Sequence, residues 1–196
     1  MIALPLSPAL TDLLPSERRS AARQRTCFAV GKLIDRGAER VCIVRNLSDQ
    51  GVGIELDAPP PAGARVRIEA RSVAPTDATV IWSRDRLAGL RLDVPIASPP
   101  LDQRPRSPRF AFPRPARLIV EDQLVDAALR DIALGGARIE HVVPARVGTL
   151  VVLLVGSLSL SGRVCWKRGG ATGIRFTRPL AAAELAALLA DEGTVA

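Results

Sequence analysis

The fold of this chain is decided by the stretch Asn46-Leu-Ser-Asp-Gln-Gly-Val-Gly-Ile-Glu-Leu56. Its first residues are short, polar side chains and a glycine, which are typical of a turn. Its later residues, Val52–Leu56, alternate between apolar and polar side chains, as a half-buried strand does. The run before it, Val41-Cys-Ile-Val44, is apolar and largely β-branched. This order predicts two strands joined by a turn.

A second copy of the pattern begins 85 positions later, at Asp131-Ile-Ala-Leu-Gly-Gly136. Further along, Ile81-Trp-Ser-Arg84 aligns with Cys165-Trp-Lys-Arg168, and Gly89-Leu-Arg-Leu92 aligns with Gly173-Ile-Arg-Phe176. These matches occur in the same order in both halves, which indicates a duplication. A period this long predicts tandem domains and not a solenoid of short repeats.

Both halves consist mainly of predicted strands. Further candidates in the first half are Ala64–Ala70, Ala78–Trp82 and Leu87–Leu92, and those in the second half are Ala116–Val120, Leu124–Ile132, Ala137–His141, Thr149–Val155, Leu158–Lys167 and Thr172–Thr177. Short strands at regular spacing with Gly and Pro turns predict a small antiparallel barrel or sandwich in each half.

One helix is predicted, from Ala181 to about Asp191, because this run is rich in alanine and leucine. Leu185, Leu188 and Leu189 share one face of such a helix. We expect this face to cover one mouth or one face of the second barrel.

The boundary between the halves is predicted at residues 97–108, where four prolines favour an extended connection. The predicted organisation is therefore an N-terminal arm (1–16), a first domain (17–96), a proline-rich linker (97–108) and a second domain (109–196) that includes the C-terminal helix.

The composition supports a folded protein with an anionic partner. Apolar residues make up 47% of the 196 residues, and the net charge of +7 comes almost entirely from arginine. No basic helix, zinc finger or aromatic stacking surface is visible, so no specific nucleic-acid partner is predicted.

A cytoplasmic location is predicted from the ends of the chain and from its cysteines. The first 16 residues contain three prolines and have neither a positively charged start nor a long apolar run, so no signal peptide or membrane span is expected. Cys27, Cys42 and Cys165 form no CxxC pair. We expect them to be reduced and mostly buried.

The sequence contains no recognisable catalytic motif. His141 is the sole histidine, which excludes a histidine-rich metal site and leaves one possible base for a Ser-His-Asp triad. Neither a Walker loop nor a dinucleotide-binding glycine fingerprint is present. The chain is predicted to have no catalytic residue, metal site or cofactor.

The candidate ligand residues lie in two short motifs. Arg19-Ser-Ala-Ala-Arg23 places two guanidinium groups four residues apart, and such groups bind phosphates and the O6/N7 edge of guanine with two hydrogen bonds each. Asn46 and Ser48 can reach another base edge, and Gly51 lets the backbone approach closely. Together these residues predict a planar, phosphorylated ligand.

This pair of motifs resembles the RxxxR and (D/N)xSxxG motifs of the PilZ family, whose members are typically receptors for the bacterial second messenger cyclic di-GMP. The resemblance covers both halves and implies two six-stranded barrels. It also implies that Arg19 and Arg23 grip the bases and phosphates of cyclic di-GMP, with Arg18 and Arg25 as supporting cations. Asn46 and Ser48 would bind a guanine, and Gly51 would permit the turn.

The second half departs from the motifs at two positions. Pro105 stands four residues before Arg109, where the first motif has an arginine, and Ala133 replaces the serine of the second motif. The remaining residues, Arg109, Asp131 and Gly136, predict a degenerate second site that binds the nucleotide weakly or not at all.

The leading hypothesis is a receptor in which the first domain senses cyclic di-GMP and the second acts on an unidentified downstream protein. The segment Ser16–Arg25 carries four arginines and one acid, so we expect it to become ordered when the ligand neutralises it. An alternative is a PilZ-like adaptor that binds proteins without a ligand. A third possibility, nonspecific nucleic-acid binding, fits the charge but has no motif behind it.

Overall fold

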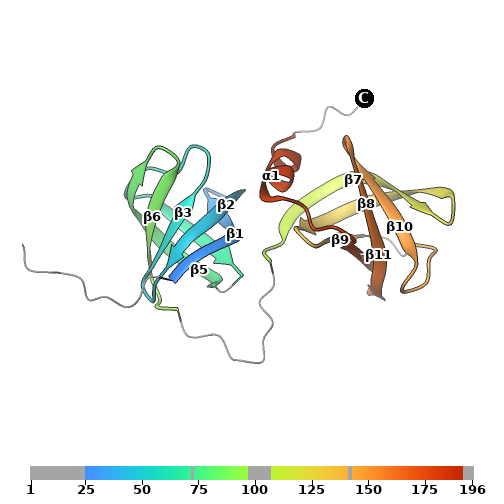
Figure 1. The fold of residues 1–196 in the computed structure, drawn as a ribbon, viewed down its shortest axis with the longest axis horizontal. Coiled ribbons are helices and arrows are strands. Elements are labelled where there is room, and N and C mark those ends of the chain that lie inside the picture. Colours follow the sequence, from blue (N-terminus) through green and yellow to red (C-terminus); the bar gives the residue numbers. More distant parts are fainter. Residues whose placement is uncertain (1–24, 72, 97–106, 141–142, 192–196) are drawn as a thin grey trace, which may run out of the picture.

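The computed structural model describes residues 25–71, 73–96, 107–140 and 143–191, which form two closed six-stranded antiparallel barrels and one helix (Figure 1). This architecture confirms the predicted fold class. The first barrel contains β1 (Arg25–Asp35), β2 (Ala38–Leu47), β3 (Gly51–Glu55), β4 (Arg65–Ala70), β5 (Val73–Arg84) and β6 (Leu87–Leu92). The second contains β7 (Phe110–Val120), β8 (Gln123–Ala133), β9 (Gly136–Ile139), β10 (Leu150–Val155), β11 (Leu158–Arg168) and β12 (Ala171–Phe176), and α1 (Ala182–Ala190) follows.

The two barrels have the same strand order. In the first, the strands pair in the order β1-β2-β3-β6-β5-β4, and β1 closes the barrel by pairing with β4. In the second, the order is β7-β8-β9-β12-β11-β10, and β7 pairs with β10. The duplication that the sequence indicates is therefore also a duplication of topology, and positions in one barrel can be compared with positions in the other.

One strand of the first barrel, β1, was not among the predicted segments. Its centre carries Gly31 and Lys32, and its register shifts between Thr26 and Ala29, so its side chains do not alternate in a simple way. Gly31 is required by packing, because a Cβ at this position would lie 2.9 Å from Sγ of Cys42. The strand is defined by its partners on both sides more than by its own pattern.

The strand β7 begins at Phe110, six residues before the predicted start. Pro113 and Pro115 obscured it, since proline usually interrupts a strand. In the structure both prolines are exposed, and they accompany a register shift between Ala111 and Arg114. Pro113 is tolerated because it lies in this bulge, and Pro115 lies where β7 is paired with β8 but not yet with β10.

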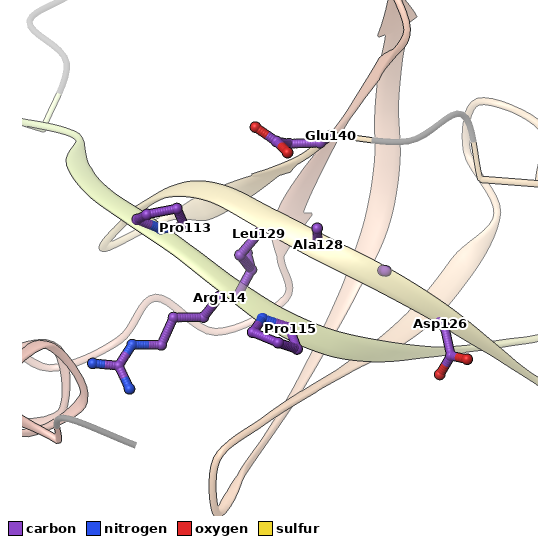
Figure 2. Close-up of a pocket in the computed structure, with 8 residues that line it drawn as sticks. Pro113, Arg114, Pro115, Asp126, Ala128, Leu129 and Glu140 are labelled. Atoms are coloured by element: carbon purple, nitrogen blue, oxygen red, sulfur yellow. The ribbon is translucent and has the colours of Figure 1, made fainter. Parts of the chain in front are cut away.

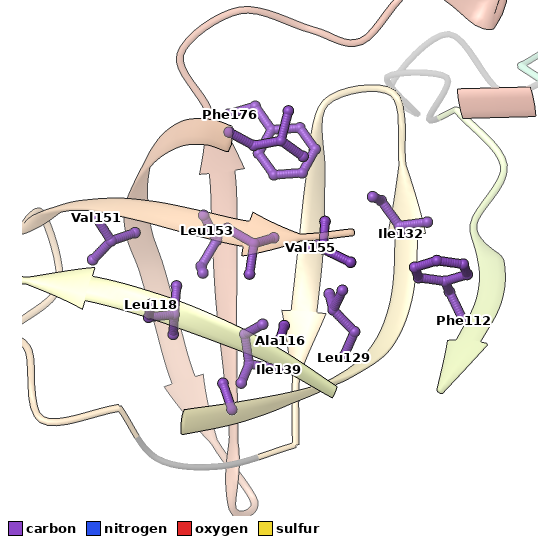
Figure 3. Packing of buried hydrophobic residues seen from close by; sticks show 14 of the residues in the cluster. Phe112, Ala116, Leu118, Leu129, Ile132, Ile139, Val151, Leu153, Val155 and Phe176 are labelled. Atoms are coloured by element: carbon purple, nitrogen blue, oxygen red, sulfur yellow. The ribbon is translucent and has the colours of Figure 1, made fainter. Parts of the chain in front are cut away.

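Each barrel has its own apolar core. The first core is built from Val, Ile, Leu, Ala and Cys42, as expected from the low aromatic content. The second core adds phenylalanines, and Figure 3 shows Phe112 and Phe176 with the aliphatic side chains of the surrounding strands. Leu185 and Leu188 of α1 are buried in this second core, so the helix covers the second barrel as predicted.

The two barrels contact each other through β1 and β2 on one side and the start of β7 on the other. Nζ of Lys32 donates a hydrogen bond to the carbonyl oxygen of Arg109 (2.8 Å), and the backbone N–H of Ala111 donates one to the Glu39 carboxylate (2.7 Å). Val41 packs against the second core, and α1 also contacts β2 (Figure 1). The contact therefore combines polar and apolar groups.

Candidate ligand-binding site

Four side-chain positions form a straight row across the outer surface of the first barrel. Asn46 on β2 lies opposite Gly53 on β3, and Gly53 lies opposite Gly89 on β6. Gly89 in turn lies opposite Trp82 on β5. The row therefore places an amide at one end, an indole at the other and two glycines between them, although Asn46 and Trp82 are 36 positions apart in the chain.

Bulges in β2 and β5 place the two end residues. The register shifts between Val44 and Asn46 on one strand and between Val80 and Trp82 on the other. Each shift inserts one extra residue after a buried valine, and such an insertion changes the direction of the side chains that follow it. Trp82 is consequently 49% exposed on the outside of the barrel, although tryptophan usually lies inside a fold.

The two glycines of the row are required by the side chains that cover them. A Cβ at Gly53 would overlap the side-chain amide of Asn46, and a Cβ at Gly89 would overlap the indole of Trp82. The amide and the indole therefore lie flat against the backbone of the neighbouring strand. The result is a surface without projecting side chains in the middle, onto which a planar ring could be placed.

The turn that follows Asn46 supplies the next group of the predicted site. The backbone N–H and Oγ of Ser48 both donate hydrogen bonds to the carbonyl oxygen of Gly51, at 2.9 and 3.2 Å. A Cβ at Gly51 would lie 3.1 Å from the carbonyl oxygen of Leu90, so this glycine allows close packing of β3 on β6. Asn46, Ser48 and Gly51 are thus brought together.

The structure adds a cation beside this turn. Arg91 on β6 lies directly opposite Gly51, and its side chain is exposed. It forms no ion pair with any residue that the structure describes. A guanidinium group therefore lies next to the row of Asn46, Gly53, Gly89 and Trp82.

The arginines of the first motif, Arg18, Arg19 and Arg23, lie outside the described residues. What the structure does show is where the chain continues from them. Strand β1 begins at Arg25, two positions after Arg23, and Thr26 lies opposite Asn46. The motif is therefore connected to the barrel directly beside the amide end of the row.

The second barrel has the same row with one decisive difference. Asp131 lies opposite Arg138, Arg138 lies opposite Gly173, and Gly173 lies opposite Trp166. The position of Gly53 is thus taken by Arg138. A Cβ at Gly173 would overlap the indole of Trp166, so the tryptophan end of the row is preserved.

Arg138 forms an ion pair with the acid of the degenerate motif. Its Nε lies 2.8 Å from Oδ2 of Asp131, and Nη1 of Arg109 contacts the other carboxylate oxygen. The Asp131 side chain is only 11% exposed. Two of the three predicted second-site residues, Arg109 and Asp131, therefore pair with each other, and Gly136 lies on the neighbouring strand β9.

Two stretches of the sequence, residues 17–99 and 103–191, match the PilZ domain. The chain belongs to the PilZ domain family. Comparison with curated proteins finds no match.

Solved structures that resemble this PilZ protein include three that contain cyclic di-GMP. They are Borreliella burgdorferi PlzA (9% identity, covering 85% of this chain and 87% of that one, TM-score 0.38), K. pneumonia MrkH (13%, 83% and 86%, 0.34) and Escherichia coli YcgR (16%, 78% and 76%, 0.30).

Several residues of this row carry no motif that the sequence alone would single out. In the sequence, Trp82, Gly89 and Arg91 stand out only as matches between the two halves, and Gly53 only as the residue that aligns with Arg138. The available signal was the repeat itself, because Trp82 and Trp166 are the only tryptophans and occupy equivalent positions. The same alignment placed Arg138 against Gly53, but only the strand pairing shows that this exchange falls inside the row.

A separate pocket of about 350 Å³ lies on the second PilZ barrel, where β7 and β8 run side by side (Figure 2). Its walls include Pro113, Pro115 and Leu129, and two carboxylates, Asp126 and Glu140, belong to its lining. The lining has one cation, Arg114, against these two carboxylates, so its charge disfavours an anionic nucleotide. The pocket is therefore a poor candidate for the ligand that the motifs predict.

The two cysteines whose side chains the structure describes, Cys42 and Cys165, are not part of the row. Burial raises the pKa of the Cys42 thiol to about 12, with the charge of Arg40 acting weakly in the opposite direction. Cys165 is half-buried, and both thiols are free. Within the described part of the chain, no cluster of His, Cys, Asp and Glu could hold a metal ion, and no helix could cross a membrane. His141 lies outside that part.

Proposed function

We propose that this protein is a non-catalytic, cytoplasmic receptor that binds cyclic di-GMP on its first barrel and passes the signal to a partner protein. The observation that carries the proposal is the row of Asn46, Gly53, Gly89 and Trp82 on the barrel surface. It offers one planar ligand an amide and an aromatic ring, both lying flat over the glycines of the neighbouring strands.

Each group in the row suits a guanine base. The amide of Asn46 both donates and accepts hydrogen bonds, and among the described residues it has no partner of its own, so it is free to bind a base edge. Trp82 presents an aromatic ring beside the glycines, and base–aromatic stacking contributes about 1–3 kcal/mol per base. Ser48 donates its hydroxyl hydrogen to Gly51, which leaves its oxygen available as an acceptor.

The phosphates would be bound by arginines. Arg19 and Arg23 belong to the segment that joins β1 beside Asn46, and Arg91 lies at the other side of the turn. A guanidinium group binds phosphate oxygens with paired hydrogen bonds, which lysine cannot reproduce. A ligand with two phosphates would need several such cations, and Arg91 together with the arginine-rich segment that precedes β1 would supply them. Arg18 is proposed to support them.

The second barrel is proposed to bind cyclic di-GMP weakly or not at all. Arg138 takes the place of Gly53, and the Asp131 carboxylate is already paired with Arg138 and Arg109. To bind a base there, the ligand would have to separate a partly buried ion pair, which costs free energy. We propose that this domain instead acts on the downstream partner protein.

The contact between the barrels offers a route for the signal. Residues 17–96 and 109–196 are proposed as the two functional domains, joined by residues 97–108. Lys32 and Glu39 of the first domain bind the backbone of Arg109 and Ala111 in the second. The Arg109 side chain in turn contacts Asp131. A movement of the first barrel would therefore reach the altered site of the second.

Titration calorimetry of the full chain with cyclic di-GMP, with GTP and with a short DNA duplex tests the proposal. We expect saturable binding of cyclic di-GMP alone, and loss of that heat in Asn46→Ala. Absence of binding to all three would favour a ligand-independent adaptor. A response to DNA that falls steeply with salt would favour nonspecific charge binding.

A further inference from the structure

The two barrels differ strongly on one outer face. In the first barrel, a row across β2, β1, β4 and β5 reads Glu39, Ile34, Arg67 and Asp77. In the second barrel, the equivalent row across β8, β7, β10 and β11 reads Leu124, Ile119, Val152 and Ser161. Three charged residues of the first barrel thus have uncharged counterparts, two of them apolar.

In the neighbouring row, an apolar residue of the second barrel again replaces a charged residue of the first. Arg65 of the first barrel forms an ion pair with Asp93, whereas the equivalent residue of the second barrel is Leu150, which is 58% exposed. Leu124 is 55% exposed, and Val147, just before Leu150, is 61% exposed. We define the apolar patch by residues of three strands and the loop before β10, namely Ile119, Leu124, Val147, Leu150 and Val152.

This clustering is not what isolated surface residues would give. Among the described residues of the second barrel, four large apolar side chains are exposed, and three of them, Leu124, Val147 and Leu150, belong to the apolar patch. Scattered exposed apolar residues are ordinary, but a group of them on one face marks a surface that another molecule covers.

Opposite charges flank the apolar patch. On one side, the β7–β8 turn presents Glu121 and Asp122, whose φ angles of 47° and 62° form a tight hairpin connection. On the other side, Arg163 and Arg175 lie directly opposite each other on β11 and β12, although like charges in that arrangement repel. None of these four side chains forms an ion pair with a residue that the structure describes.

We propose that the apolar patch is the interface of a symmetric dimer, and that its occupant is the same patch on a second copy of this chain. A two-fold axis through the patch brings the acidic turn of one copy against the arginines of the other, twice. An apolar centre between flanks of opposite charge is complementary to itself. A purely acidic partner would instead be repelled by Glu121 and Asp122.

The corresponding face of the first barrel offers no such patch, because its exposed positions carry Arg65, Arg67 and Asp77 and because Glu39 is engaged within the chain. Glu39, the counterpart of Leu124, accepts the hydrogen bond from Ala111 of the second barrel. The β7–β8 hairpin of the second barrel extends away from the first barrel, so a second copy can reach it (Figure 1). The dimer would leave the row of Asn46 and Trp82 uncovered, and its formation is independent of any ligand.

Sedimentation velocity of the full chain tests the dimer. At concentrations up to about 100 μM, where a dimer with a micromolar dissociation constant forms, we expect twice the chain mass of 20.9 kDa. The variant Leu150→Arg/Val152→Arg installs the residues of the first barrel, which such strands accommodate, and should raise the dissociation constant at least tenfold. Its circular dichroism and melting temperature should match those of the wild type.

Charge reversal distinguishes this specific interface from nonspecific hydrophobic association. Glu121→Arg/Asp122→Arg and Arg163→Glu/Arg175→Glu should each weaken the dimer, and an equimolar mixture of the two variants should form a heterodimer. A wild-type protein that stays monomeric at 100 μM would overturn the proposal. So would an unchanged dimer in Leu150→Arg/Val152→Arg.

Discussion

Nε of Arg138 lies 2.8 Å from Oδ2 of Asp131, and this ion pair in the second barrel stands where Gly53 lies opposite Asn46 in the first. The pair has the distance of an ion pair without the geometry of a hydrogen bond, since Nε forms none with the described residues. In this row the two barrels therefore differ, because one has a glycine beside the amide and the other has a guanidinium group paired with a carboxylate.

Transfer of this ion pair into the first barrel should abolish ligand binding. In Asn46→Asp/Gly53→Arg the new side chains reproduce the Asp131–Arg138 pair, so the fold is expected to be retained. We expect cyclic di-GMP affinity to fall at least tenfold, because the new guanidinium group projects from the middle of the row and pairs with the motif acid. Calorimetry measures the affinity, and Asn46→Asp alone is the control that should still bind. Retained affinity in the double variant would show that Arg138 is not what closes the second site.

The arginines of the first motif should be required for affinity. Arg19→Ala and Arg23→Ala are each expected to weaken cyclic di-GMP binding at least tenfold, because a bidentate arginine–guanine contact contributes about 1–3 kcal/mol. Lysine at either position should not restore binding, since it lacks the planar fork. Arg36→Ala, in the exposed turn between β1 and β2, is the matched control. Normal affinity in both motif variants would contradict the proposed site.

Trp82 should report directly on the ligand. In Trp166→Phe it is the sole tryptophan, so quenching of its fluorescence by cyclic di-GMP would place the base on the indole. Trp82→Ala should weaken binding by about 1–3 kcal/mol through lost stacking, and Gly89→Ala should weaken it by displacing the indole. Trp166→Ala and Gly173→Ala, the same changes in the second barrel, should leave affinity unchanged. Equal effects in both barrels would mean that the indole is structural.

Lys32 should stabilise the contact between the barrels. Its Nζ lies 3.1 Å from Glu39 and 3.3 Å from Glu69, and its side chain is 12% exposed. Lys32→Met leaves two carboxylates without their cation and Arg109 without its donor, which should lower the free energy of unfolding by on the order of 1–2 kcal/mol. Arg67→Met removes the half-exposed pair with Asp77 and should change stability by less than about 0.5 kcal/mol. Urea unfolding of both variants makes the comparison, and similar losses would refute it.

Cys42 should be unreactive in the folded protein. Because burial raises its pKa to about 12, it stays protonated at pH 8, and only the thiolate attacks alkylating reagents. In a Cys27→Ser background, mass spectrometry should find Cys165 labelled first and Cys42 labelled only in denaturant. The folded state holds the thiol proton more tightly than the unfolded state does, because the pKa is raised from 9.0 to about 12. The free energy of unfolding should therefore fall as pH rises from 9.0 towards 12. Cys42→Ala should remove this loss, and rapid labelling of native Cys42 would contradict the burial.

The sequence alone predicted most strands, because alternation of apolar and polar residues depends only on which face of each strand is buried. It missed β1, where Gly31 and Lys32 replace the expected alternation. Gly31 is there because Cys42 needs the space, and Lys32 because two acids and the neighbouring barrel surround it. Both reasons are properties of neighbours that lie elsewhere in the sequence.

The sequence by itself determined the duplication, the barrel fold, the helix and the Asn46–Gly51 turn, since these depend on local periodicity and on short motifs. Only the tertiary structure brought Asn46 and Trp82 to the two ends of one row. It also showed that Arg138 lies in the equivalent row of the second barrel, where it pairs with Asp131. The physical reason is that barrel closure and bulges decide which residues of distant strands lie opposite each other. A shift of one residue in register turns a side chain to the other face, and that shift depends on the partner strand.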